Sequence, residues 1–471
     1  MGLYLAVADR SGRFADHACD AHWTWRRTRG FTRPDGLFVL ADLGTTLIGV
    51  LDDAIDRAPV SPKRDRGRRV AATPVLRLGS HIVGMNLIRR SAARDLRVDF
   101  FRGLALWWIY TDHIPGDILA NLSLHTVAMC DATEVFVLLA GYGAGLSYGT
   151  AFRRNGAIST IADILRRAGT LYVAHIFLFV MFTAQVTYWA TALNRLNYLE
   201  ETRLDVLGDD PYRSIWEVVL LRFQPNLLNI LPLYVVLLVF FAATIWLVRW
   251  PRLLFALSFA IYLVVRFTNL NLGGRGGEGW YFDPFAWQFL FNIGVLLACK
   301  PPRAPSYRWP VDAAAVLIIM LGVIVTVGIE PDPHRLDWFN GSVVLHYLVI
   351  EDKTGLYPFR LISILAFTWL CIRLIRFDQP WLRSPGAAPL VLFGQNSLPV
   401  FCSGVVFGTV ARLGLDYDDH VFMQAAINLF GALGMLGVAA LTAWYRTKGH
   451  PNAAVGGSPA LLPVSSQPDT G

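Results

Sequence analysis

The sequence predicts an all-α membrane protein, a helix bundle with about ten transmembrane spans. The 471 residues are 54% hydrophobic and only 16% charged, which is less charge than a soluble chain of this length carries. The hydrophobic residues come in runs of membrane length. The basic residues gather between these runs, a pattern that indicates orientation in a bilayer rather than binding of nucleic acid.

The candidate spans follow one another along the chain. They lie near 100–116, 132–150, 169–190, 227–248, 252–268, 284–299, 311–329, 357–375, 388–411 and 421–445. Arginine and lysine are concentrated in alternate connections, and the acidic residues are concentrated in the others. Because basic connections stay on the cytoplasmic side, both termini are predicted to be cytoplasmic.

Three parts of the chain differ in composition. Residues 1–84 hold charge clusters and no run of membrane length, which predicts either a disordered basic arm or an extension that is not native. Residues 85–450 form the predicted membrane domain. Residues 451–471 are rich in Gly, Ser and Pro, which predicts a disordered tail. The five cysteines have no metal-binding spacing, and no metal site is predicted.

Two ionisable residues mark the ends of the first span. Arg102 and His113 are eleven positions apart, about three helical turns, so both lie on one helix face about 16 Å apart. Ionisable groups in a span are costly and suggest function. Imidazole can act as a general base near neutral pH, so His113 is the candidate base. Asp112 adjoins it, although neighbouring side chains on a helix diverge by about 100°.

The second span adds a carboxylate at a similar depth. Glu134 lies just inside the predicted outer boundary, where it can orient the imidazole and stabilise its charged form. The alternative is a purely structural role. Gly141, Gly143 and Gly145 follow on the same run, and they predict close helix packing without chemistry.

These residues resemble a known family. Arg102-x10-His113 resembles the signature of the membrane acyltransferase 3 superfamily, and 134–141 resembles its second-helix motif. The strings 94–104, 280–291 and 394–401 resemble the OpgC branch, whose members are associated with succinylation of osmoregulated periplasmic glucans. The resemblance covers roughly residues 90–445.

The resemblance implies an enzyme of the bacterial inner membrane. It would transfer an acyl group, succinyl in that branch, from cytoplasmic acyl-CoA to a hydroxyl of a periplasmic glucan. Acyl-CoA would be a donor substrate, with no tightly bound cofactor. His113 would take the hydroxyl proton, Glu134 would orient His113, and Arg102 would hold the anionic donor. Arg97 and Asp99, within the same motif, are further candidates for substrate binding.

Other polar residues have two interpretations each. One interpretation of Trp287 and Gln288 is that they form part of a sugar-binding surface. The other is that Trp287 lies at the membrane interface and Gln288 hydrogen-bonds to a neighbouring helix. One interpretation of Asn396 and Ser397 is that they donate hydrogen bonds to the acyl donor or to the developing oxyanion. The other is that they make polar contacts between helices.

Lys353 and Arg360 form a basic pair on the predicted outer side. They can bind the free carboxylate of a succinyl group, or else form ordinary ion pairs with Glu351 or Asp352. Aromatic residues in and beside the outer connection 191–226 predict contact with carbohydrate or an ordinary membrane interface; they are Trp189, Tyr198, Tyr212 and Trp216. We expect the side chain of His175, in the third span, to be packed and hydrogen-bonded.

Two other classes of function share some of these features. A proton-coupled transporter or glycan exporter also places Arg, His and Glu in its spans. No internal repeat supports a transporter, and a structural or sensory protein would not need Arg102 and His113 together. Release of free CoA distinguishes the acyltransferase from both.

Overall fold

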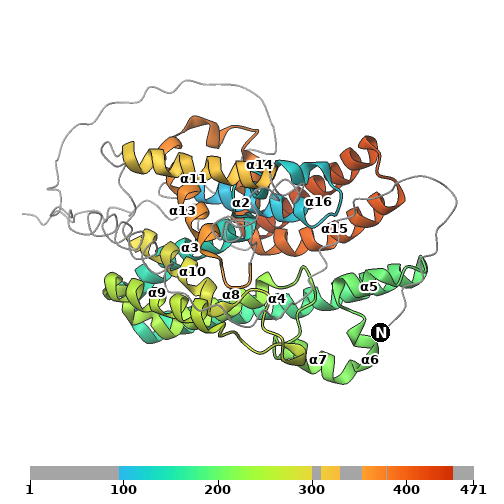
Figure 1. Ribbon diagram of the computed structural model, residues 1–471, viewed down its shortest axis with the longest axis horizontal. Helices are drawn as coiled ribbons and strands as arrows, with labels where there is room; N and C mark the ends of the chain where they lie inside the picture. Colours follow the sequence, from blue (N-terminus) through green and yellow to red (C-terminus); the bar gives the residue numbers. More distant parts are fainter. Residues whose placement is uncertain (1–94, 300–308, 329–352, 378, 449–471) are drawn as a thin grey trace, which may run out of the picture. The chain divides into compact units, whose positions relative to one another are not determined.

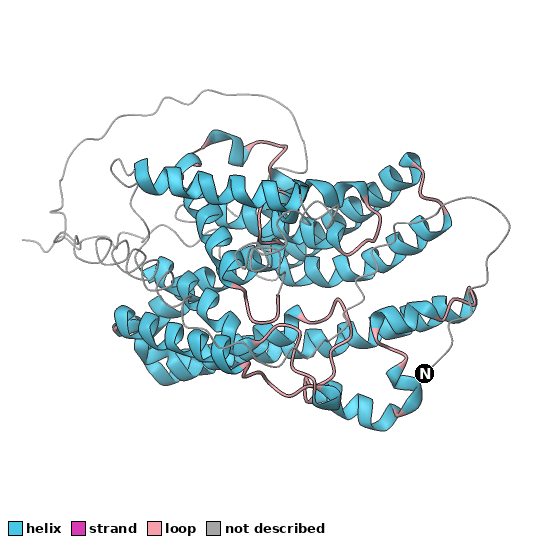
Figure 2. Cartoon of the chain, viewed as in Figure 1, coloured by secondary structure: helices cyan, strands magenta, loops and turns pink. Residues whose placement is uncertain are grey.

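The predicted helical spans are present in the structure, a computed structural model that describes residues 95–299, 309–328, 353–377 and 379–448. In these ranges the regular elements are helices, and Gly273 and Gly279 form an isolated antiparallel bridge (Figure 2). The all-α prediction is therefore confirmed. The predicted N-terminal arm and C-terminal tail lie outside the described residues.

A helix lies at each predicted span. These helices are α2 Leu96–Asp112, α3 Ala132–Asn155, α4 Ala157–Ala192, α8 Ile230–Thr244 continued by η3 Ile245–Arg249, α9 Pro251–Thr268, α10 Pro284–Cys299, α11 Trp309–Gly328, α13 Pro358–Leu374, the pair α14 Ala388–Gln395 and α15 Ser397–Tyr417, and α16 Val421–Lys448. Seven of the described helices are long and apolar enough to cross a membrane, namely α3, α4, α8 with η3, α9, α11, α15 and α16. The count of ten crossings and the side of each terminus stay predictions.

Local sequence explains where the first helix begins and ends. The Asp95 side chain accepts a hydrogen bond from the Arg97 backbone N–H, which caps the start of α2. The helix ends at Asp112, before Pro115, because proline lacks the backbone N–H and restricts the residue before it. The helix thus lies about one turn earlier than the predicted span 100–116.

Two other spans depart from the prediction. Helix α4 has 36 residues and starts at Ala157, well before the predicted start at 169. The predicted ninth span is two helices, since the chain leaves helical geometry at Asn396 (φ −120°, ψ 40°). Apolar runs indicate which residues lie in a bilayer, but a helix can extend beyond it or break within it.

Short helices fill the connections. Helices η1 Ile118–Leu122 and η2 Leu124–Thr126 join α2 to α3. Helices α5 Asn197–Thr202, α6 Val206–Asp209 and α7 Pro211–Val219 join α4 to α8. The remaining described elements are η4 Arg275–Gly277 and η6 Pro380–Arg383.

Helix α2 lies among α3, α14 and α15 (Figure 1). The contact with α14 is between backbones, since a Cβ on Gly103 would lie 1.8 Å from the Leu390 carbonyl oxygen. A Cβ on Gly141 of α3 would lie 2.0 Å from the Phe291 carbonyl oxygen of α10. Small residues let helix backbones approach this closely. The packing prediction for Gly141 is confirmed.

Two further sequence predictions concern Gly145 and His175, which lie inside the bundle. Gly145 packs against Ala298 and Val295 of α10, as predicted. His175 of α4 is fully buried, but neither ring nitrogen has a hydrogen-bond partner among the described residues. The predicted packing of His175 is therefore confirmed, but the predicted hydrogen bond is wrong for the part of the chain that the structure describes.

Candidate active site

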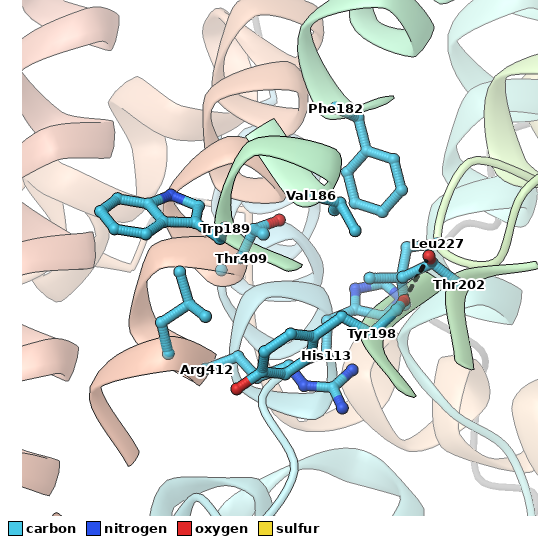
Figure 3. Close-up of a pocket in the computed structure, with 11 residues that line it drawn as sticks. His113, Phe182, Val186, Trp189, Tyr198, Thr202, Leu227, Thr409 and Arg412 are labelled. Carbon is cyan, nitrogen blue, oxygen red and sulfur yellow. Dashed lines mark hydrogen bonds between the residues drawn. The ribbon is translucent and has the colours of Figure 1, made fainter. Parts of the chain in front are cut away.

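His113 is the residue immediately after α2, and it lines a pocket (Figure 3). The Ile109 carbonyl, one turn earlier, lies near the imidazole. Imidazole can take a proton from a bound hydroxyl near neutral pH, so a histidine that lines a pocket is a candidate general base.

The pocket next to His113 is built by segments that are far apart in the sequence. Helix α4 supplies Phe182, Val186 and Trp189, α5 supplies Tyr198 and Thr202, the connection before α8 supplies Leu227, and α15 supplies Gly408, Thr409, Arg412 and Leu413. The wall is apolar in its greater part, with a few hydroxyl and charged groups. Small-molecule sites commonly combine such surfaces.

The aromatic residues singled out from the sequence divide into two groups. Trp189 and Tyr198 line the His113 pocket. Tyr212 and Trp216 of α7 are 88% and 62% exposed, and neither lines it. The structure therefore brings only the first pair to the candidate base.

Arg102, three turns before His113, lies against α3. Its Nη2 donates to the Leu139 carbonyl oxygen at 2.9 Å, and a Cβ on Gly143 would lie 3.0 Å from the same nitrogen. Gly143 thus leaves room for the guanidinium rather than serving only helix packing. Arg102 lies within α2, about 16 Å along the helix axis from His113, which follows the end of the helix.

Four charged residues form a group that we call the ion-pair cluster: Asp131, Glu134, Lys353 and Arg360. The Nε of Arg360 donates to Glu134 Oε1 at 2.6 Å, and Nη2 donates to Asp131 Oδ2 at 3.1 Å. Lys353 Nζ lies 2.8 Å from Asp131 Oδ2, and this carboxylate raises the pKa of Lys353 above its usual value. Glu134, Asp131 and Arg360 are all buried. Their charges are tolerated there because they are paired and hydrogen-bonded.

The cluster corrects the expected partner of Glu134. Its second oxygen, Oε2, accepts the Asp131 backbone N–H at 3.0 Å, which completes a capping box at the start of α3. Both oxygens of Glu134 are thus engaged by Arg360 and Asp131, and the direct orientation of His113 by Glu134 is not what the contacts show.

The predicted basic pair does form ion pairs, but with other partners. Lys353 and Arg360 contact Asp131 and Glu134, which lie more than 200 residues earlier in the chain. The predicted partners Glu351 and Asp352 lie outside the described residues.

Trp287 and Gln288 are structural supports in this arrangement. The fully buried Trp287 donates its indole N–H to the carbonyl oxygens of Lys353 and Thr354 at 3.0 and 3.2 Å, which fixes the backbone beneath the Lys353 ammonium. Gln288 Nε2 donates to the Ser258 carbonyl of α9 at 2.8 Å. The interhelical alternative is confirmed for Gln288, and Trp287 is too deeply buried for an interfacial or sugar-stacking surface.

Asp112 forms an ion pair with a second histidine, His125. Its Oδ1 lies 3.5 Å from Nδ1 of His125, which also lies 2.5 Å from the Ser123 hydroxyl. The Asp112 carboxylate raises the pKa of His125 above its ordinary value. Consecutive positions on a helix point about 100° apart, which explains why Asp112 and His113 have different partners.

The remaining candidates lie near the start of α2. Arg97 pairs with Asp95 at 2.7 Å and donates to the Ile375 carbonyl at 2.9 Å. Gln395 Nε2 donates to the buried Asp99 at 3.4 Å.

Asn396 and Ser397 follow Gln395 directly, at the break between α14 and α15. The buried Asn396 donates its side-chain amide to the Leu392 carbonyl at 3.0 Å, within its own segment. This bond supports the break between the two helices. The candidates Arg97, Asp99, Arg102, Asn396 and Ser397 thus form a second group, at the opposite end of α2 from His113.

Two residues of the site were missed by the sequence prediction. Asp131 was assigned only to a connection, although an Asp followed three positions later by Glu at the start of an apolar run is the signature of a capping box. Arg412 was not singled out. It lies just past the predicted ninth span on the predicted outer side, where basic residues are scarce, and that exception was the available signal.

A possible metal-binding group lies elsewhere. Among the described residues, Asp418, Asp419 and His420 are the group whose ligand atoms come within 4.8 Å of one another. They precede α16, none of them lines the His113 pocket, and exposed acidic groups of this kind are common without a metal.

Comparison with known proteins identifies the family of the chain. A sequence profile of the OpgC protein matches residues 94–447, about three quarters of the chain and nearly all of the described helices. No curated protein and no solved structure matches the chain. The match includes the helix that carries Arg102 and His113, the ion-pair cluster and the pocket, and on this extent the chain belongs to the OpgC protein family.

Proposed function

We propose that the chain is an O-acyltransferase of the bacterial inner membrane. It moves an acyl group, succinyl by the family resemblance, from cytoplasmic acyl-CoA to a hydroxyl of a periplasmic glucan. Membership of the OpgC family supports a role in glucan modification. The observation that carries the proposal is the position of His113, an imidazole that lines a mainly apolar pocket with a few hydroxyl and charged groups.

The chemistry follows from the weakness of a sugar hydroxyl as a nucleophile. His113 takes the hydroxyl proton while the oxygen attacks the thioester carbonyl carbon. The carbon–sulfur bond breaks, the imidazolium returns its proton to the departing thiolate, and the products are an ester and the free thiol of CoA. A general base of this kind contributes about 10²–10⁴-fold to the rate.

The donor is proposed to enter at the opposite end of α2. Arg102 carries a planar guanidinium suited to phosphate, and Arg97 lies within the same motif. The pantetheine arm of CoA is long enough to bridge the separation of about 16 Å between Arg102 and His113. Asp99, Asn396 and Ser397 border this end and are proposed to shape the donor site.

The ion-pair cluster has a different role in this proposal. Lys353 and Arg360 already contact the carboxylates of Asp131 and Glu134, which favours a structural role over binding of a succinyl carboxylate. The cluster holds the start of α3 and the segment before α13 next to His113. Glu134 is then a positioning residue that acts through the fold around the base.

The test is thiol release by the purified full chain in detergent. Succinyl-CoA, acetyl-CoA and longer thioesters are offered with a β-linked glucose oligosaccharide, and mass spectrometry follows the acyl mass on the sugar. We expect thiol release that depends on the sugar and matches the ester formed. If no thioester yields sugar-dependent thiol, the acyltransferase proposal is wrong and a transporter becomes the better hypothesis.

A further inference from the structure

We propose that α7 is embedded in the lipid bilayer and contacts lipid through one apolar face, which we call the α7 stripe. The stripe consists of Tyr212, Ile215, Trp216 and Val219. These positions have the i, i+3, i+4, i+7 spacing of a single helix face. The inference places in lipid a part of the connection 191–226, which hydropathy assigns to the outside of the membrane. It does not depend on the reaction that the chain catalyses.

The two faces of α7 are reversed relative to those of a helix on a water-soluble protein. The members of the α7 stripe are between 37% and 88% exposed. The opposite face of the helix is turned into the protein, and it includes the buried polar residues Ser214 and Glu217. A helix next to water turns its polar residues outward and its apolar residues inward. The reversed arrangement therefore indicates an apolar environment outside α7.

Arg275, in the connection between α9 and α10, holds the polar face of α7 inward. Its Nη1 donates to Ser214 Oγ at 2.6 Å and to Glu217 Oε2 at 3.1 Å. The other oxygen of Glu217, Oε1, accepts a hydrogen bond from Arg213 Nε at 2.9 Å. The buried polar groups of α7 are thus satisfied by protein partners, and the helix can face lipid without leaving them unpaired.

The end of α7 is attached to a membrane helix. The Tyr172 hydroxyl of α4 donates to the Val219 carbonyl oxygen at 2.8 Å, and α7 lies beside α4 at the edge of the bundle (Figure 1). Tyr172 lies within the predicted span 169–190, and α4 is long and apolar enough to cross a membrane. Val173 and Phe177 of α4 are 67% and 66% exposed. The α7 stripe therefore lies next to a surface of α4 that itself faces lipid.

The composition of the stripe favours lipid over a carbohydrate. Sugar hydroxyls need hydrogen-bond donors and acceptors beside an aromatic surface. On α7 the buried Ser214 and Glu217 are turned inward and occupied by Arg275, and two of the four stripe residues are aliphatic. Trp and Tyr are the aromatic residues enriched where a bilayer meets water, and an apolar helix face binds a bilayer through its buried area.

The test is EPR spectroscopy of nitroxide labels on the full chain in lipid nanodiscs. The labels are attached to Ile215→Cys and Trp216→Cys in a background whose native cysteines are replaced by alanine, after size exclusion and a thermal melt confirm the fold. Oxygen concentrates in lipid, whereas a nickel complex stays in water, so the ratio of their collision rates reports the environment of each label. Phe177→Cys on α4 is the lipid control, and the exposed Asp419→Cys, between α15 and α16, is the water control.

We expect the oxygen-to-nickel ratio at positions 215 and 216 to match that at 177 and to exceed that at 419 several-fold. A ratio equal to that at 419 would show that the stripe faces water and would overturn the inference. Exclusion of both reagents would also overturn it, because a protein surface would then cover the stripe. Protection from nickel only after addition of cellopentaose would assign the stripe to carbohydrate instead. The measurement uses no acyl donor, so its result is separate from that of the acyltransferase test.

A second measurement tests the role of Arg275. Arg275→Met should make the label at position 216 more mobile, because Ser214 and Glu217 lose their shared donor. Arg203→Met is the matched control, since the ion pair that it breaks, with Glu278, is exposed and does not include α7. An unchanged spectrum in Arg275→Met would overturn the assignment of Arg275 as the residue that orients α7.

Discussion

Two polar regions meet where α2 ends and α3 begins, and they differ in how their charges are satisfied. In the ion-pair cluster, Arg360 contacts both Asp131 and Glu134 within 3.1 Å, and all three side chains are buried. In the neighbouring pocket, His113 forms no ion pair with a described residue and lines a cavity. The charged groups of the ion-pair cluster hydrogen-bond to one another. The polar groups that line the pocket can form hydrogen bonds with a ligand.

This difference separates the ionisable groups of a membrane bundle that take part in catalysis from those that stabilise the fold. A buried charge with complete partners maintains local structure, and its removal exposes the partner to an apolar environment. A titratable group that lines a cavity can exchange a proton with what enters. The two regions are nevertheless linked, because the charges of Lys353 and Asp131 act on the His113 imidazole. Four changes test this distinction.

The largest effect is expected from the pocket. His113→Ala should lower the rate of acyl transfer by about 10²–10⁴-fold, because it removes the proposed base. The melting temperature should stay close to that of wild type, since His113 pairs with no charged group in the described structure. Initial rates of thiol release, with a thermal melt of the same sample, check both parts. An unchanged rate would remove His113 from the chemistry.

The next effect belongs to the ion-pair cluster. Arg360→Met should destabilise the fold by about 3–5 kcal/mol, because it leaves the Glu134 carboxylate buried without its guanidinium partner. Arg203→Met is the matched control, since it breaks an ion pair with Glu278 whose side chains are 54% and 66% exposed, and such pairs contribute about 0–1 kcal/mol. Unfolding in detergent compares the two. Equal losses would contradict the structural role of the cluster.

A smaller effect is expected where α10 supports the cluster. Trp287→Phe keeps the aromatic ring but removes the N–H that donates to Lys353 and Thr354, which should destabilise the fold by about 1–2 kcal/mol. Trp216→Phe, on the exposed face of α7, should change nothing. If both variants melt together with wild type, Trp287 does not anchor the segment that carries Lys353.

The smallest effect concerns pH. The Asp112 carboxylate raises the pKa of His125, so the protonated form stabilises the fold at low pH, and this contribution is lost as pH rises through the raised pKa. His125 is 41% exposed, so solvent screening limits the contribution to less than about 1 kcal/mol.

Melting temperatures of wild type and His125→Gln test this over a window of about pH 6 to 8. The two proteins should differ most at the acidic end and converge at the basic end. A constant difference across the window would show that the ion pair with Asp112 does not titrate.

The sequence predicts the positions of the helices well because apolar runs are local. Each predicted span contains a helix, and Gly141 and Gly145 pack as small residues on a helix are expected to. The break at Asn396 and the length of α4 were not predictable, because neither changes the apolar pattern. Hydropathy shows where lipid lies and gives little information on helix continuity.

The predictions for the site residues follow the same rule, since local features were predicted and long-range contacts were not. His113, Trp189 and Tyr198 were chosen as individual residue types, and the structure brings them to one pocket. The contact of Glu134 with Arg360 joins residues 226 positions apart, and no local pattern reports such a pair. Glu134 was expected to contact His113 because both lie at a similar predicted depth in the membrane. Its hydrogen bonds in the structure are to Arg360 and to the Asp131 backbone instead.

The most direct test of the whole account is transfer across a sealed bilayer. Proteoliposomes with succinyl-CoA trapped on the side of the Arg102 end and cellopentaose added on the side of the His113 end should form succinylated sugar outside and an equal amount of free CoA inside. His113→Ala in the same orientation should form neither, while keeping its fold. Equal product from both proteins would contradict the central claim that His113, in its open pocket, performs the transfer.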